Sequence, residues 1–254
     1  MKGIREALFV KREALKNEIR DTLHEKRVLT RYVPIIHTSA DLGSLAKDVH
    51  KKGVSSLGKE FWEEHIRTVD GFWDAIAHYF DIIDVSGAKL YQDGMIADSE
   101  IGEMIVAEGI KLGSKNYELI SGLLKRGAVL MKTEDLTLVK EEHSNLIAIT
   151  QARSITRKLI AFIKYKLVKN RLLKKRDTFI AKVIDETLNP GEKGILFIGA
   201  YHNVKQKLPS DIHIIEVKDI EKVRSYQTML PYYNKHKKQL DESSSYLVKV
   251  ESDE

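Results

Sequence analysis

The chain of 254 residues carries 42 lysines and arginines against 37 aspartates and glutamates, a net charge of +5, and contains no cysteine. Its length and hydrophobic content suffice to bury a sizeable core, which excludes disordered and fibrous proteins. The lack of cysteine excludes disulfide scaffolds, iron–sulfur clusters, cysteine-bound zinc and thiol nucleophiles. No apolar run is long enough to cross a bilayer, and the charged N-terminus lacks a signal peptide's apolar block. We therefore expect a cytoplasmic protein without membrane partners.

The first third of the chain is expected to form two helices around one short strand. Apolar residues recur at helical intervals through residues 1–28, which predicts an amphipathic N-terminal helix. A strand is predicted at Val33–His37, and the stretch 51–59, with its glycines and serines, is predicted to be a loop. Lys59–Phe80 carries large aromatic side chains on one face, so this helix is expected to anchor the core.

The remaining elements alternate between strands and helices. This alternation, with a strand that is apolar on both faces (GILFIGA), predicts one α/β domain over residues 1–254 with a largely parallel sheet. In chain order, the predicted elements are a strand or strand pair within 81–94, helices at 97–113 and 116–127, a strand at 128–135, a helical stretch that starts at 136, a continuous basic helix at 146–188, strands at 194–200 and 212–217, and a last segment that starts helical and finishes in an acidic, frayed tail at 241–254.

Polar side chains of catalytic type follow four of the predicted strands. His37 follows the first strand, Asp93 the second, Glu134 the third, and His202 the strand GILFIGA. Ligands of parallel sheets collect beyond the carboxyl ends of the strands, so we expect these side chains to converge on one site. Asp41, in the loop after His37, is a further candidate. Taken singly, each residue could instead cap the next helix or bond the loop backbone.

The segment KKRDTFIAKVIDETLNPGEKGILFIGAYHNV resembles the C-terminal signature of the TraB/Tiki/erythromycin-esterase-like superfamily. In that signature an arginine–asparagine or arginine–aspartate pair opens a helix, and an apolar strand ends in Gly-Ala-x-His. Arg176-Asp177 and Gly199-Ala200-Tyr201-His202 match this pattern. By the same resemblance, His37 corresponds to the family's histidine after its first strand, and Glu134 to its acidic residue after a later strand.

The resemblance implies a hydrolase that cleaves a small ester or a peptide, with His37, Glu134, Arg176 and His202 as catalytic residues. His37, Glu134 and His202 could hold a divalent metal, Mn²⁺, Co²⁺ or Zn²⁺, that acidifies a bound water. Without a metal, one histidine could act as the general base. Arg176 would stabilise an oxyanion or a substrate carboxylate. The expected substrate-binding residues are Asp41, Asp93 and Asp177.

The positive charge of the chain is concentrated in one segment. Residues 151–176 contain ten lysines and arginines and no acidic residue, while the rest of the chain has 32 basic and 37 acidic residues. On a helical wheel, five of the basic residues form a stripe about 33 Å long. Four apolar residues lie on the opposite side, where we expect them to face the core or a partner helix. The stripe consists of Arg153, Arg157, Lys164, Arg171 and Lys175, and the apolar residues are Ile155, Leu159, Phe162 and Ile163.

This basic helix offers an alternative to hydrolysis, namely a non-catalytic interaction protein that binds nucleic acid or an acidic protein partner. Nucleic acid is the less favoured partner, because no aromatic side chains are interleaved along the stripe for base stacking. A simpler interpretation is a solvated helix face. The basic helix and the N-terminal helix could also pack across an interface, so a homo-oligomer is a further expectation.

Overall fold

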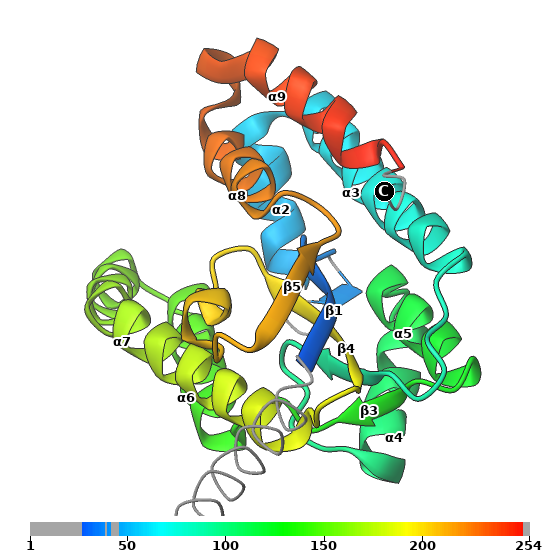
Figure 1. The fold of residues 1–254 in the computed structure, drawn as a ribbon. Coiled ribbons are helices and arrows are strands. Elements are labelled where there is room, and N and C mark those ends of the chain that lie inside the picture. Colours follow the sequence, from blue (N-terminus) through cyan, green and yellow to red (C-terminus); the bar gives the residue numbers. More distant parts are fainter. Residues whose placement is uncertain (1–26, 39, 42–45, 251–254) are drawn as a thin grey trace, which may run out of the picture.

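The computed structural model describes residues 27–38, 40–41 and 46–250, and within them the chain forms a five-stranded, all-parallel sheet (Figure 1). The strand order is β3-β2-β4-β1-β5, so β4 lies at the centre, between β2 and β1. The predicted α/β class with a parallel sheet is therefore confirmed. The strands are β1 (Arg27–Ile35), β2 (Lys89–Gln92), β3 (Val129–Met131), β4 (Lys193–Gly199) and β5 (Ile212–Glu216).

Helices cover both faces of this sheet (Figure 1). Most of them lie on one side, whereas the C-terminal half of the longest helix, α7, packs on the other. The helices are α2 (Ala46–Leu57), α3 (Lys59–Asp81), α4 (Ser99–Lys111), α5 (Lys115–Lys125), α6 (Leu136–Thr150), α7 (Ile155–Thr187), α8 (Ile220–Met229) and α9 (Tyr233–Val248), with short 3₁₀ turns η2 (Val204–Lys207) and η3 (Leu230–Tyr232).

The period-2 alternation of strand side chains divides the core into two layers. Ile195 and Phe197 of β4 pack into the larger layer with the aromatic face of α3, whereas Leu196 and Ile198 pack against Ile180 and other residues of α7. All four β4 side chains are at most 2% exposed. A strand covered on both faces must be apolar throughout, which explains the sequence GILFIGA.

The aromatic helix is confirmed at Lys59–Asp81, with Phe72, Trp73 and Phe80 buried, but the loop predicted before it is wrong. Residues up to Leu57 belong to α2. Gly53 lies inside that helix. A Cβ at this position would stand 2.4 Å from the Trp62 ring, so a larger residue would clash with it. The glycine thus allows close packing of α2 on α3 rather than flexibility.

The single basic helix predicted at 146–188 is also wrong, because two helices, α6 and α7, cover this stretch. The chain leaves α6 after Thr150, and the Ser154 hydroxyl caps α7 by accepting a hydrogen bond from the Arg157 amide. No proline or glycine marks this break, so its sequence signal is weak. The two helices fold back on each other and pack together at one edge of the molecule (Figure 1).

Several smaller predictions also need correction. The tail predicted as frayed from residue 241 continues α9 to Val248, with Leu247 fully buried. The strand pair expected within 81–94 is the single strand β2, and β1 starts at Arg27 and ends before His37. The predicted N-terminal helix lies outside the described residues, apart from positions 27–28, which belong to β1.

The apolar side of α7, predicted to face the core or a partner helix, faces away from the protein. Ile155 is 89% exposed, and Leu159, Phe162 and Ile163 are at least half exposed. The basic stripe, from Arg153 to Lys175, is exposed as well. Among the helices that the structure describes, none is long and apolar enough to cross a membrane.

Candidate active site

Four neighbouring strands bring the predicted residues to one edge of the sheet. His37 lies just beyond β1, Asp93 follows β2, Glu134 follows β3 and His202 follows β4. Because the strands are parallel, these positions meet at their carboxyl ends. A cleft of about 670 Å³ opens there, with α6 and α7 contributing one wall.

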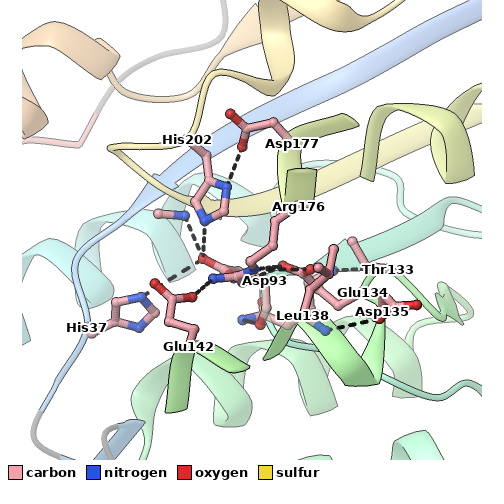
Figure 2. Close-up of polar contacts among 12 residues, drawn as sticks. His37, Asp93, Thr133, Glu134, Asp135, Leu138, Glu142, Arg176, Asp177 and His202 are labelled. Atoms are coloured by element: carbon pink, nitrogen blue, oxygen red, sulfur yellow. Dashed lines mark hydrogen bonds and ion pairs between the residues drawn. The ribbon is translucent and has the colours of Figure 1, made fainter. Parts of the chain in front are cut away.

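Arg176, in the C-terminal half of α7, pairs with three carboxylates at the base of this cleft (Figure 2). Its Nε donates to both oxygens of Glu134, at 3.1 and 3.2 Å, and its Nη2 donates to Asp93 Oδ1 at 2.6 Å. Nη2 also bonds Glu134, and Nη1 bonds Glu142 of α6. The side chain of Glu134 is 0% exposed and that of Arg176 9%. Most of the guanidinium donors are thus engaged within the protein.

His202 is held by two more carboxylate contacts. Its Nδ1 lies 2.6 Å from Oδ1 of Asp177, whose other oxygen accepts a hydrogen bond from the Asn203 amide. On the opposite side of the ring, Nε2 lies 3.5 Å from Asp93 Oδ2. Asp177 therefore fixes the orientation of the imidazole, while the neighbouring residue Arg176 points to the other carboxylates.

Asp93 is the centre of the arrangement, although we predicted it only as a substrate-binding residue. Its Oδ2 accepts the Gly199 amide at 3.0 Å and lies between the Nε2 atoms of His202 and His37, the latter at 4.0 Å (Figure 2). A Cβ on Gly199 would stand 3.1 Å from this oxygen. The glycine of the Gly-Ala-x-His sequence thus lets the carboxylate approach the backbone.

The charges in this cluster shift one another's protonation. Burial raises the pKa of Glu134 to about 7, although the hydrogen bonds from Arg176 oppose the shift. Burial would also raise the pKa of Asp93, but His202, Arg176 and His37 together hold it well below the usual range. For His202, burial lowers the pKa, but Asp93 and Asp177 outweigh burial and raise it. The cluster therefore favours the imidazolium form of His202, whereas Glu134 is only partly protonated near pH 7.

His37 and Asp41 lie nearer to solvent in the same cleft. The side chain of His37 is 43% exposed, which leaves it accessible to a ligand. Asp41 accepts hydrogen bonds from the amide and hydroxyl of Thr38, at 2.6 and 2.9 Å, and from the Ser114 hydroxyl. Asp41 thus ties the loop after β1 to the start of α5.

Sequence reasoning missed several residues of the cleft, among them Glu142, Asn116 and Gln227. Glu142 is one of two adjacent glutamates in a polar helix, and nothing in that pattern distinguishes it from its exposed neighbour Glu141. In the described part of the chain, the side-chain oxygens of Asn116 and Gln227 have no hydrogen-bond partner, although both residues line the cleft. These oxygens could accept hydrogen bonds from a bound ligand.

The predicted metal ligands do not form a metal site in this arrangement. Glu134 gives both oxygens to Arg176, and both ring nitrogens of His202 face carboxylates. Within the described ranges, no group of three histidine, aspartate or glutamate side chains is placed to hold a metal ion. Metal binding therefore stays a prediction to be tested.

His65, on the aromatic helix α3, is a half-buried histidine. Its Nδ1 lies 2.9 Å from the Tyr226 hydroxyl, and burial lowers its pKa to about 4. A small pocket of about 120 Å³ lies between this residue and His37, with Trp62 and Ile66 in its wall. The neutral imidazole thus belongs to an apolar environment next to the cleft.

No protein-family model matches this chain, and neither a curated protein nor a solved structure matches it. The resemblance to the TraB/Tiki/erythromycin-esterase-like superfamily therefore stays a prediction.

Proposed function

We propose that the protein is a hydrolase that activates water with histidines at the carboxyl edge of the sheet. One observation supports this most strongly, the carboxylate of Asp93 between the Nε2 atoms of His37 and His202. Paired imidazoles and a buried carboxylate in an accessible cleft are the groups that general acid–base catalysis requires. The substrate would be a small ester or a peptide.

In this proposal His37 is the general base, because its imidazole is the more exposed of the two and lines the cleft. A water oxygen attacks the carbonyl carbon while Nε2 of His37 accepts the water's proton. The C–O or C–N bond then breaks, and this proton passes to the departing oxygen or nitrogen. The products are a carboxylic acid and an alcohol or amine.

His202 would stabilise the negative charge that develops on the carbonyl oxygen. Asp93 and Asp177 raise its pKa, which favours the imidazolium form. Most donors of Arg176 bond Asp93, Glu134 and Glu142. We therefore assign Arg176 to positioning Asp93 rather than to the oxyanion role suggested by the family resemblance.

The test is hydrolysis of ester and peptide panels by the full-length protein. We expect His37→Ala and His202→Ala each to lower kcat by about 10²- to 10⁴-fold. His78→Ala is the matched control, because His78 is exposed, pairs with nearby Asp81 and does not line the cleft. Wild-type protein that hydrolyses nothing, with or without added Mn²⁺, Co²⁺ or Zn²⁺, would overturn the proposal.

Metal dependence is tested in the same assay. No step of the proposed reaction passes through a metal, so activity is expected to survive dialysis against a chelator. Calorimetry with each of the three ions then measures binding directly, with His202→Ala as the comparison. Tight binding that this variant abolishes would favour the metal scheme over general-base catalysis.

A further inference from the structure

The N-terminal half of α7 exposes an unusual number of large apolar side chains. Six residues in the stretch 155–167 are each at least 50% exposed. At 100° per residue they fall within an arc of about 160° on one side of the helix. Apolar surface gathered in this way marks an interaction site more often than single exposed residues do. The six are Ile155, Leu159, Ile160, Phe162, Ile163 and Leu167, and we call them the apolar face.

The apolar face lies opposite the side of α7 that packs on the protein. Leu172 is 2% exposed, and the hydroxyl of Tyr165 lies 3.5 Å from Glu142 of α6. On the helical wheel, Leu172 points roughly 160° and Tyr165 roughly 140° away from the middle of the apolar face. The helix pair α6–α7 forms one edge of the molecule (Figure 1). The apolar face therefore points outward, away from the core.

Basic side chains border the apolar face on both sides. Apart from Arg176, all nine lysines and arginines of 151–176 are exposed, and none pairs with an acidic side chain in the described part of the chain. On the helical wheel, Lys158 and Lys169 lie along one edge of the arc, and Arg157, Lys164 and Arg171 along the other. Long basic side chains can extend past apolar surface and place their charges in a polar layer.

We propose that this face of α7 binds the surface of a bilayer that contains anionic lipids. A helix with apolar residues on one side and lysines and arginines along its edges is suited to lie in the interface, with its apolar side among the acyl chains. Anionic headgroups then complement the unpaired basic residues. The proposal concerns the membrane surface, since none of the described helices could cross a membrane.

Other partners would match the apolar side chains or the basic side chains of α7, but not both. A second copy of the chain would bring two sets of basic residues together and repel. A nucleic acid would complement the charges but would leave the apolar face against water or phosphate. A bilayer with anionic lipids covers both kinds of side chain. Because Lys169 also lines the cleft, binding would hold the cleft next to the bilayer.

The test is flotation of the full-length protein with phosphatidylcholine vesicles, with and without phosphatidylglycerol. We expect binding only to the anionic vesicles, and weaker binding as salt increases. Two α7 variants should each lower the partition coefficient by at least about tenfold. The first combines Leu159→Gln, Phe162→Gln and Leu167→Gln, and the second combines Lys158→Glu and Lys164→Glu.

Each variant has a matched control on another helix. Ile101→Gln with Met104→Gln removes apolar side chains of α4 that are 64% and 70% exposed. Lys235→Glu with Lys237→Glu reverses exposed charges of α9. Both controls should bind vesicles as the wild type does, and circular dichroism should show the same helix content in every variant.

Three results would overturn the proposal. The full chain could fail to bind anionic vesicles, or the α7 variants could bind as well as the controls. The α7 variants could also abolish self-association measured by sedimentation equilibrium, or binding to a DNA duplex, while vesicle binding is unchanged. The hydrolysis assay is independent of all three.

Discussion

Nε of Arg176 donates hydrogen bonds to both carboxylate oxygens of Glu134, at 3.1 and 3.2 Å, while the same guanidinium bonds Asp93 and Glu142. One cation thus pairs with three carboxylates, two of which follow β2 and β3 while the third lies on α6. This pairing joins the helical hairpin α6–α7 to the sheet.

Removing the guanidinium should destabilise the fold strongly. Arg176→Ala leaves the buried carboxylates without a counter-charge, so we expect the free energy of unfolding to fall by about 3–5 kcal/mol. Arg176→Lys should cost less, because it keeps the charge but loses the forked hydrogen bonds. Urea unfolding followed by circular dichroism measures both. The control is Arg171→Ala on the exposed side of the same helix, with an expected change below about 0.5 kcal/mol. Equal losses in the Arg176→Ala and Arg171→Ala variants would contradict this prediction.

Protonation of Glu134 should make stability depend on pH. Its pKa is about 7 in the folded protein, because of burial, against 4.5 for an ordinary glutamate. Between pH 4.5 and 7, Glu134 of the folded protein binds more protons than Glu134 of the unfolded chain. Protonation of Glu134 therefore stabilises the folded state fully below pH 4.5, and this stabilisation is lost as pH rises through 7. Asp93, whose pKa is lowered, stays ionised throughout this window.

Glu134→Gln removes this titration. We expect the difference in unfolding free energy between wild type and variant to change by up to about 1.4 kcal/mol per pH unit within the window. Urea unfolding at several pH values measures this difference, with Glu141→Gln, at an exposed position of α6, as the control. A difference that is constant across pH would show that Glu134 stays ionised.

The sequence predicted those residues of the candidate site that come just after a strand of the parallel sheet. Glu134 and His202 come directly after strands, and parallel strands must end at one edge, so their convergence could be expected before the structure. Glu142 could not be found in this way, because it reaches Arg176 only when α6 packs against α7. That packing depends on the break at 151–154, which has no proline or glycine to mark it.

The same limit applies to the surface of α7. Helical periodicity correctly placed Leu159 and Ile163 on one side of a helix, but periodicity does not specify what covers that side. The structure leaves both residues at least half exposed. By contrast, α3 has a similar pattern that is covered by the sheet, and there the prediction of a core helix is confirmed.

Gly199 should not tolerate a side chain. In Gly199→Ala the new methyl group would stand 3.1 Å from Asp93 Oδ2 and 3.4 Å from His202 Cδ2, so the carboxylate must move. We expect a loss of stability of about 1–3 kcal/mol, as for other overpacked sites. If the proposed function is right, kcat should fall as well. Gly122→Ala is the control, because its new methyl group would meet no atom within 4 Å and the helix gains from alanine. The prediction fails if both alanine variants are equally stable.

Asp177 should raise the pKa of His202 through the hydrogen bond to Nδ1. Burial alone would lower that pKa, and Asp93 and Asp177 reverse the shift. In Asp177→Asn the carboxylate charge is lost at a position 2.6 Å from the ring, so we expect the His202 pKa to fall. NMR titration of ¹⁵N-labelled histidines measures it directly. Asp81→Asn, which removes the carboxylate beside the exposed His78, outside the cleft, is the matched control and should leave the His202 titration unchanged. A His202 titration that is unchanged in Asp177→Asn would mean that Asp93 alone sets the charge of the imidazole.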